Sequence, residues 1–314
     1  MKRIIPFYEK RYIYFIISGL IILAGIVGMI VNGVQLDIQF KGGAILKYTT
    51  TAPVDAARAA EVAGTTLNRL VDAQLTNDLL TKQERLVLNL AGNEGLDADA
   101  QQKLDNALKA EFPNAGLAVS ETILVEPFFG KQFLRNGMLA IVLASILIVF
   151  YVWYSFRRIS GLSAGVMALV ALLHDLLVVF FTCVLFKIPI GDSFVAVALT
   201  IIGYSINDTI VIYDRIRENA RLDSKMPVDQ LVNRSVTQSL SRSVNTNLAV
   251  FLSISLVWIF AFGNGIDSIQ RFALPMAVGC ISGCYSTVCI AGPLWAMWQL
   301  RKKNNRLKHV KQNA

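Results

Sequence analysis

The chain has 314 residues, of which 54% are hydrophobic and 17% are charged, and its mean hydropathy is +0.51. An ordinary soluble domain carries about 25% charged residues, so this composition excludes a single water-soluble domain. The net charge of +8 would favour nucleic-acid binding in a soluble protein, but a membrane protein uses lysine and arginine to set its orientation. We therefore expect an integral membrane protein that binds no nucleic acid.

Six segments are long and apolar enough to cross a bilayer as helices. A helix rises about 1.5 Å per residue, so a hydrocarbon core of roughly 30 Å needs about 20 mostly apolar residues. The first segment is longer than the apolar core of a signal peptide and lacks a following A-x-A cleavage site, so we expect it to remain as an anchor. The six spans are predicted at 13–33, 136–156, 161–186, 192–213, 244–263 and 271–298.

Lysine and arginine are unevenly divided between the two sides of such a six-span chain. Eighteen of the 30 lie in the arm 1–12, the short loop after the second span, the loop 214–243 and the tail 301–314. The positive-inside rule places that side, with both termini, in the cytoplasm. The basic residues of the insert 34–135 do not oppose this orientation, because long loops are translocated largely regardless of charge. The insert is therefore predicted to be extracytoplasmic.

The insert alternates between strand and helix periodicity in the order β-α-β-β-α-β. This order is typical of a ferredoxin-like α+β domain, in which two helices cover one face of an antiparallel sheet. The pair Gly42–Gly43 inside the first strand indicates either a turn or bulge or a close approach of another backbone. The strands are predicted near 37–48, 71–80, 83–90 and 117–125, and the helices near 54–70 and 98–112.

The sequence thus predicts an α-helical polytopic membrane protein with six transmembrane helices and one extracytoplasmic ferredoxin-like domain between the first two helices. The other five spans would form a bundle over 136–300. The insert has no histidine, no cysteine and no nucleophile with a paired base, so we expect no enzyme chemistry there. No cofactor or metal site is predicted.

Polar and charged side chains inside the predicted spans are functional candidates, because an unpaired charge in lipid costs several kcal/mol. His174 and Asp175 lie midway along the third span. The fourth span carries Asp208, with Asn207 beside it and Ser205 three residues before it, so one face of this helix is polar. The alternative is interhelical hydrogen bonding alone, which is worth about 0.6 kcal/mol for each bond.

The fifth span has an apolar run of only 15 residues at 248–262, about 22 Å as a helix, which is too short to cross the core. The helix must therefore include polar residues before this run, among them Arg242. If the fourth span begins near Asp192, Asp208 lies about 24 Å along it, at a depth similar to that of Arg242. We therefore expect these two side chains to pair. A buried carboxylate whose protonation is tuned by an arginine is what a proton relay requires.

Several motifs resemble those of one family, the SecF branch of the SecD/SecF protein-export membrane proteins in the resistance-nodulation-division superfamily. The most specific is the run of 17 residues from Gly203 to Asn219, whose charged end we otherwise expect to be a solvated helix end. Two local departures are the cysteine at 284, where threonine is usual, and the stretch 262–265, which lacks the paired glycines of the family. Further matches are Leu36-Asp37-x-x-Phe40-x-Gly42-Gly43, Leu173-His174-Asp175, Ser239-Leu240-Ser241-Arg242-Ser243 and Arg271-Phe272-Ala273.

The resemblance implies a non-enzymatic subunit of the bacterial cytoplasmic membrane that pairs with a homologous six-span SecD subunit. The pair would assist the SecYEG translocon, with YajC or YidC as further contacts, and would use protons to move unfolded secretory polypeptides. The membrane acid of the family falls on Asp208 and its functional arginine on Arg242. Secondary candidates for the relay are His174, Asp175, Asn207 and Ser205, and the motif residues are Asp37, Gly42, Gly43, Asp214 and Arg215.

Two other functions stay open from the residues alone. An intramembrane aspartyl protease would need a second acid opposite Asp208, for which only Asp175 is available, and the chain has no Gly-x-Gly-Asp motif. A small-molecule or lipid transporter of the same superfamily usually carries two six-span repeats in one chain, whereas this chain has one.

Overall fold

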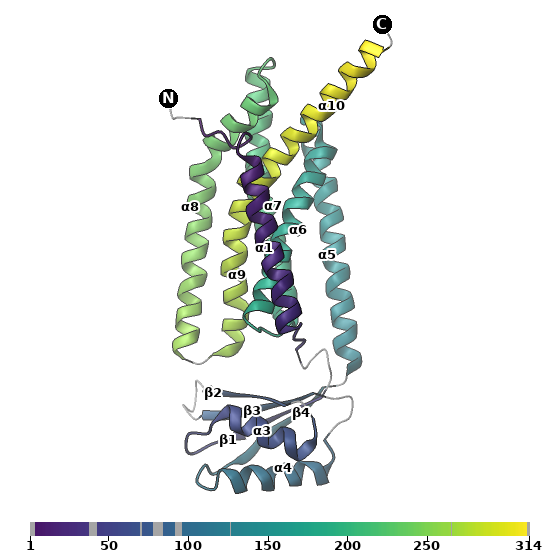
Figure 1. Ribbon diagram of the computed structural model, residues 1–314. Helices are drawn as coiled ribbons and strands as arrows, with labels where there is room; N and C mark the ends of the chain where they lie inside the picture. The colour runs from purple at the N-terminus through teal and green to yellow at the C-terminus, as the bar shows by residue number, and fades with distance from the viewer. Residues whose placement is uncertain are drawn as a thin grey trace.

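The computed structural model describes residues 4–37, 43–69, 71–77, 84–91, 96–125, 127–264 and 266–312. Long helices run side by side as a bundle, and a small four-stranded sheet with two helices lies beyond one end of it (Figure 1). Both termini lie at the other end of the bundle (Figure 1). The sheet domain is inserted between the first and second long helices.

Within these residues, six helical units have the length and composition needed to cross a membrane, so the chain is a multi-pass membrane protein. Each predicted span lies on one of them. A short 3-10 turn, η1 (Arg157–Ile159), follows the second unit. The six are α1 (Arg11–Asn32), α5 (Pro127–Ser155), α6 (Gly161–Leu185), α7 (Asp192–Leu222), α8 (Val228–Gly263), and the continuous run of α9 (Asp267–Ser286), η2 (Thr287–Ala291) and α10 (Gly292–Gln312).

The connection between α7 and α8 is helical over most of its length, and is not the loop predicted at 214–243. α7 continues to Leu222, and α8 begins at Val228. The predicted tail 301–314 is likewise helical as far as Gln312. The spans are predicted from runs of apolar residues, and such a run marks only the part of a helix that crosses the lipid. Beyond it, ion pairs between side chains three residues apart support the polar extension of α7.

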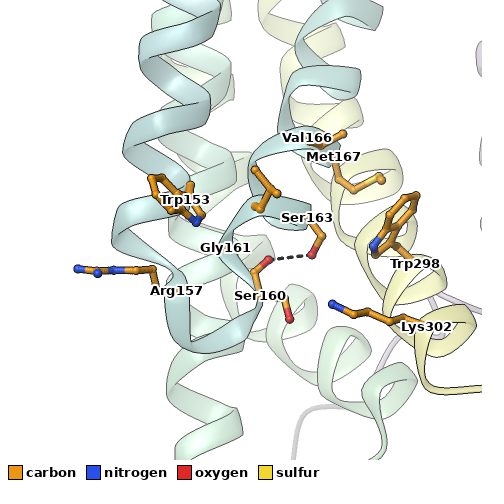
Figure 2. Close-up of a pocket in the computed structure, with 10 residues that line it drawn as sticks. Trp153, Arg157, Ser160, Gly161, Ser163, Val166, Met167, Trp298 and Lys302 are labelled. Atoms are coloured by element: carbon orange, nitrogen blue, oxygen red, sulfur yellow. Dashed lines mark hydrogen bonds between the residues drawn. The ribbon is translucent and has the colours of Figure 1, made fainter. Parts of the chain in front are cut away.

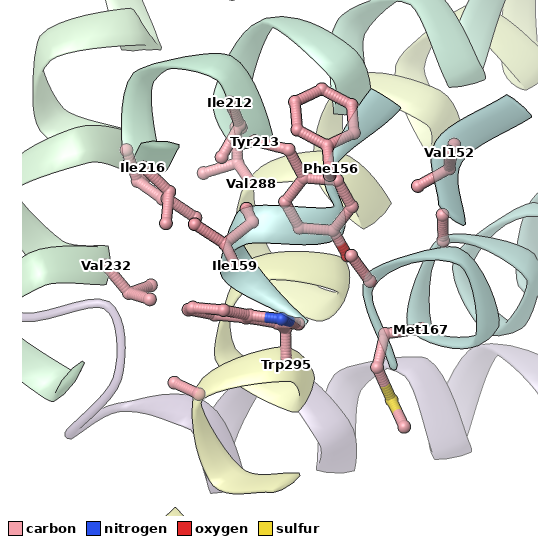
Figure 3. Close-up of a cluster of buried hydrophobic side chains, with 14 of the residues drawn as sticks. Val152, Phe156, Ile159, Met167, Ile212, Tyr213, Ile216, Val232, Val288 and Trp295 are labelled. Atoms are coloured by element: carbon pink, nitrogen blue, oxygen red, sulfur yellow. The ribbon is translucent and has the colours of Figure 1, made fainter. Parts of the chain in front are cut away.

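Apolar side chains fill the end of the bundle that holds both termini (Figure 3). Tyr213 of α7 is fully buried, and its ring meets that of Phe156 edge-on, with 5.9 Å between the centroids. The ring of Trp295 on α10 lies 6.5 Å from the same tyrosine ring. The Asn219 amide donates to the Ser235 hydroxyl at 2.9 Å, which ties the polar extensions of α7 and α8 together. This end of the bundle is therefore a packed unit.

The sheet domain has the predicted order of elements. Its strand order is β2-β3-β1-β4, and all neighbouring strands are antiparallel. Asp55 and Asp97 cap the two helices by accepting hydrogen bonds from backbone N–H groups of the first turn. The elements are β1 (Gly43–Thr49), α3 (Ala56–Leu67), β2 (Val71–Asn77), β3 (Glu84–Ala91), α4 (Ala98–Glu111) and β4 (Ala118–Val125).

One face of this sheet carries the hydrophobic core of the domain. Leu46 of β1 and Leu88 of β3 lie opposite each other in the register, and both are fully buried. Leu104 and Leu108, one turn apart on α4, are fully buried as well. Full burial of such a side chain contributes about 1.5–3 kcal/mol, so this layer stabilises the packing of helices on the sheet.

Asp37 is not part of the first strand, contrary to the strand predicted near 37–48. Its backbone N–H donates to the carbonyl of Ile190 at 3.0 Å, in the connection between α6 and α7. The described strand begins at Gly43, whose φ of +145° favours glycine. Alternation of apolar and polar residues indicates an extended segment, but it does not indicate which other segment that one pairs with. Gly42 lies outside the described residues.

Candidate functional site

Among the residues that the structure describes, two carboxylates are buried in the membrane bundle, where lipid makes an uncompensated charge costly. Asp175 of α6 has no exposed surface, and Asp208 of α7 is 9% exposed. Both are candidates predicted from the sequence, and both accept hydrogen bonds from neighbouring helices. The two sites differ in the number of donors that surround them.

Asp175 contacts polar side chains of three helices. Ser205 of α7 donates to its Oδ2 atom at 2.7 Å. Ser282 and Ser286 of α9 donate to Oδ1 and Oδ2 at 2.6 and 2.7 Å. The Nδ1 atom of His174, also on α6, lies 3.3 Å from Oδ1. A carboxylate has about four acceptor positions, and the three serine hydroxyls fill three of them at Asp175. This side chain thus joins α6, α7 and α9.

His174 extends this group of contacts to α1. Its ring lies 5.9 Å from the ring of Tyr285 on α9. The hydroxyl of Tyr285 donates to the backbone carbonyl of Tyr14 at 2.6 Å and lies 3.2 Å from the hydroxyl of Ser18. The surroundings of Asp175 therefore reach a fourth helix of the bundle.

Asp208 has fewer partners, and they come from α8. Ser243 donates to its Oδ1 atom at 2.6 Å, and the side-chain amide of Asn247 donates to Oδ2 at 3.3 Å. About half of the acceptor positions of this carboxylate lack a donor among the described residues. A negative charge is therefore less well compensated by hydrogen bonds at Asp208 than at Asp175.

A polar surface of α7 joins the two carboxylates. Ser205, which donates to Asp175, lies three residues before Asp208 on the same helix. Thr209 donates to the carbonyl of Ser205 at 3.1 Å, and its hydroxyl lies 3.4 Å from that of Thr287. Thr287 begins the π-helical turn η2, a feature that is frequent at functional sites. The layer between the acids thus consists of Ser205, Thr209 and Thr287. It is linked to Asp175 through Ser205 and lies on the helix that carries Asp208.

Two glycines of α9 allow this helix to approach α7 closely. A Cβ at Gly279 would lie 2.6 Å from the Cδ1 atom of Ile201, which is too short for a real contact. A Cβ at Gly283 would lie 3.3 Å from that of Ser205. Small residues at such positions permit short distances between membrane helices. The serines of α9 can reach Asp175 because the two backbones are this close.

The expected pairing of Arg242 with Asp208 is not found. Arg242 is exposed and forms no ion pair with that carboxylate in the described part of the chain, whereas its neighbour Ser243 donates to it. Successive residues of a helix point about 100° apart, so a match in depth does not decide which of two neighbours faces the acid. Asn207, another predicted relay residue, is exposed as well.

Arg242 and Asn207 belong to a set of exposed polar residues on α7 and α8, which we term the outer polar strip. Thr200 and Gly203 complete it on α7, and Thr246 completes it on α8. A Cβ at Gly203 would have no heavy atom of a neighbour within 4 Å. Polar side chains and an open glycine in a membrane helix are typical of a surface that contacts another helix.

The remaining motif residues lie at the two ends of the bundle, away from the buried acids. Asp37 forms an ion pair with the Nη1 atom of Arg271 at 3.5 Å, near the sheet domain. Asp214 and Arg215 each pair with a residue three positions further along the polar extension of α7. These contacts hold the ends of the helices and are not part of the layer between the acids.

Sequence reasoning missed four residues that donate to the two carboxylates. The residues of each pair are four positions apart, so they share a helix face, and this spacing is the signal that could have found them. The spacing alone cannot distinguish them from the small packing residues that are common in membrane helices. The pairs are Ser243 with Asn247 and Ser282 with Ser286.

Sequence comparison finds relatives along nearly the whole chain. The family described as "Protein export membrane protein SecD/SecF, C-terminal" matches residues 105–301. The chain is 33% identical over 291 residues to the protein translocase subunit SecF of Alicyclobacillus acidocaldarius, covering 92% of this chain and 91% of that protein. It is also 33% identical to the protein translocase subunit SecDF of Brucella abortus, covering 95% of this chain and 38% of that protein.

Solved structures show the same fold. The crystal structure of SecDF from Thermus thermophilus, a translocon-associated membrane protein, matches with a TM-score of 0.77 at 26% identity, covering 95% of this chain and 39% of that one. SecDF in its super-membrane-facing form matches with a TM-score of 0.71 and 25% identity, over 98% of this chain and 40% of that one. The chain thus spans about two fifths of these SecDF chains. It belongs to the SecD/SecF family of protein-export membrane proteins.

Proposed function

We propose that the chain is a SecF-type subunit that pairs with a SecD subunit and uses the proton-motive force to assist the SecYEG translocon. Its clients are unfolded secretory polypeptides, and YajC or YidC are further neighbours. Relatives named protein translocase subunit SecF support the export role. Relatives named SecDF, which are more than twice as long as the part that matches, support the SecD partner. These names do not favour the alternative of a small-molecule or lipid transporter.

In this proposal the chain lies in the bacterial cytoplasmic membrane with both termini in the cytoplasm. The sheet domain, as a ferredoxin-like domain, is then outside. The position of both termini at one end of the bundle supports this orientation (Figure 1), as does the basic composition of that end. A reporter enzyme fused after Ala314 should be active only inside the cell, and activity only outside would contradict the orientation.

The observation that carries the proton-coupled mechanism is the incomplete donor set of Asp208. A relay needs a group that can lose and regain its charge inside the bundle. Asp175 accepts from three serine hydroxyls, which favours one state of its carboxylate, whereas Asp208 accepts only from Ser243 and Asn247 among the described residues. We therefore assign proton binding to Asp208, and to Asp175 the positioning of α7 through Ser205.

One proton for each cycle is energetically sufficient. Moving one charge through about 150 mV releases roughly 3.5 kcal/mol. This amount shifts a two-state equilibrium by a few hundredfold, which is enough to drive the sheet domain between two positions. A single titrating site in the bundle therefore meets the need, and no second proton carrier is required.

The outer polar strip is the surface against which the SecD partner packs in this proposal. An arginine and an asparagine that face lipid are costly, and burial against a second subunit removes that cost. Gly203 leaves room for a close partner helix. Arg242 then lies in the interface between the subunits, beside Ser243. There its fixed positive charge biases the protonation of Asp208.

Export by cells that depend on this chain tests the assignment. Asp208→Asn should leave membrane insertion and pairing with SecD intact but abolish the release of a secretory precursor that depends on the proton-motive force. Arg242→Ala should have much the same effect. Asp214→Asn, which makes the same change at the exposed end of α7, serves as the matched control and should be milder. Normal, uncoupler-sensitive export by a well-expressed Asp208→Asn variant would show that this carboxylate is structural.

A further inference from the structure

A pocket of about 550 Å³ opens between α5, α6 and α10, at the end of the bundle that holds both termini (Figure 2). Trp153 stands on α5, and Trp298 and Lys302 stand on α10 (Figure 2). Arg157 lies on the turn η1, and its guanidinium points away from Trp298 and Lys302 (Figure 2). None of the lining residues that the structure describes is acidic. The rest of the lining comes from the start of α6 and consists of Ser160, Gly161, Leu162, Ser163, Val166 and Met167.

The floor of the pocket is held in place by close contacts. The hydroxyl of Ser163 donates to the carbonyl of Ser160 at 2.8 Å and accepts from the side-chain amide of Gln299 at 2.8 Å. A Cβ at Gly161 would lie 2.4 Å from the carbonyl oxygen of Trp153, so glycine lets α6 begin this close to the end of α5. The pocket is therefore formed by the packing of the three helices.

One positive charge faces this pocket. The side chain of Lys302 extends from α10 toward the start of α6 (Figure 2). Arg157 lies at the rim, where its guanidinium stacks over the ring of Tyr154 at 4.3 Å and its Nε donates to the carbonyl of Tyr154 at 3.3 Å. Among the residues described, neither cation forms an ion pair with an acid. An anion from outside the chain can therefore pair with Lys302 in the pocket.

The pocket lies at the depth where lipid meets water. Trp153 lies two residues before the end of α5, and Trp298 lies just before the basic run that begins at Arg301. Tryptophan together with lysine and arginine is typical of this boundary. Leu162 and Val166 lead from the pocket along α6 toward the hydrocarbon, and both are exposed. The site thus has a charged end and an apolar end, which fits an amphiphile.

We propose that this pocket binds the head group of an anionic phospholipid, with the phosphate beside Lys302 and an acyl chain along Leu162 and Val166. Lysine and arginine next to a membrane attract anionic lipids, and each such cation near the surface raises affinity about fivefold. A zwitterionic phospholipid has no net charge and gains little from them. The outer polar strip that we assign to SecD lies on α7 and α8, so a lipid at this pocket does not compete with that partner.

Quenching of tryptophan fluorescence by lipids with brominated acyl chains tests the proposal, because two tryptophans line the pocket. The chain, together with its SecD partner, is reconstituted in phosphatidylcholine vesicles that contain brominated phosphatidylglycerol or, in a matched series, brominated phosphatidylcholine. Brominated phosphatidylglycerol should quench at a severalfold lower mole fraction. Lys302→Gln should reduce this preference about fivefold. Arg301→Gln removes the same charge from the neighbouring residue of α10, outside the lining, and should leave the preference unchanged. The guanidinium of Arg157 stacks on Tyr154 outside the pocket, so Arg157→Gln should leave the preference unchanged as well.

The three replaced side chains are exposed, so each variant is expected to fold. Equal quenching of the unmodified chain by the two lipids would overturn the proposal. An equal loss in Arg301→Gln and Lys302→Gln would do so too, because it would indicate attraction by the whole basic surface. Release of phosphatidylglycerol from the pocket by millimolar inorganic phosphate would show that the site recognises phosphate without the lipid chain, which also contradicts the proposal.

Discussion

Removing the carboxylate of Asp175 should loosen the contact between α6, α7 and α9. In Asp175→Ala, the hydroxyls of Ser205, Ser282 and Ser286 lose a buried acceptor at 2.6 to 2.7 Å. Hydrogen bonds between membrane helices average about 0.6 kcal/mol and reach about 1.7 kcal/mol, so three of them give a loss of about 2–5 kcal/mol.

Asp175→Asn separates the shape of this side chain from its capacity to accept. Asparagine fills nearly the same volume, and its oxygen can still accept two of the hydroxyl protons. Its amide group donates, so the serines on that side must turn to accept and must send their own protons elsewhere. The free energy of unfolding should fall by about 1–2 kcal/mol, so the stability of Asp175→Asn lies between that of the unmodified chain and that of Asp175→Ala.

Titration with sodium dodecyl sulfate ranks the stability of the unmodified chain and the two variants. Each is purified with its SecD partner in mild detergent. The detergent fraction at the unfolding midpoint, followed by circular dichroism, should fall from the unmodified chain to Asp175→Asn and further to Asp175→Ala. Asp214→Ala, which removes an exposed carboxylate from α7, should cost less than about 1 kcal/mol. If Asp175→Ala unfolds at the same midpoint as the unmodified chain, the contacts of this carboxylate do not hold the helices together and the reasoning is refuted.

Two further changes test the packing of α1 and of the sheet domain. Gly25→Leu should destabilise the bundle by about 1–3 kcal/mol, because a Cβ there would lie 2.1 Å from the ring of Phe181, whereas Gly19→Leu, with no neighbour within 4 Å, should be neutral in the same detergent titration. Tyr48 donates to Asp105 at 2.5 Å, and burial together with this hydrogen bond raises the pKa of Tyr48 well above its usual value of 10.0. The folded domain therefore keeps a proton that the unfolded chain releases, and stability should fall as the pH rises above about 10. Tyr48→Phe should abolish this part of the loss, as measured by hydrogen exchange of the β1 amides against pH.

The spans and the sheet domain could be predicted because both depend on local patterns. A run of about 20 apolar residues crosses the lipid whatever its neighbours are, and alternation along a strand marks its buried face. The same logic fails for Asp37, an extended residue that pairs with Ile190 and not with the sheet. It also fails for the extension of α7 to Leu222, which polar contacts support.

The two buried acids could be found from the sequence because the cost of a charge in lipid depends on the residue alone. The residues that donate to these acids could not be found in this way, because they depend on how each helix is rotated about its axis. Ser282 and Ser286 are 107 and 111 residues from Asp175 in the chain, and only the packed bundle brings them together. For the same reason Ser243, and not Arg242, faces Asp208.

The donors of the two acids divide the bundle into parts that depend differently on a proton. Asp175 ties α6, α7 and α9 together, and these contacts do not involve Asp208. Asp208 meets α8 through Ser243 and Asn247, and hydrogen bonds to a carboxylate weaken when it is neutralised. On the proposed mechanism, the contact that weakens is therefore that between α7 and α8.

From Ser243, α8 runs without a break to Gly263, about 30 Å away, at the end that faces the sheet domain (Figure 1). A helix of this length transmits a shift at one end to the other, because its backbone hydrogen bonds keep it straight. The fold thus provides a path from the proposed proton site to the sheet-domain side of the membrane that leaves the contacts of Asp175 unbroken. Asp175 has more hydrogen-bond donors than Asp208. One part of the bundle can therefore stay fixed while α8 responds to the proton.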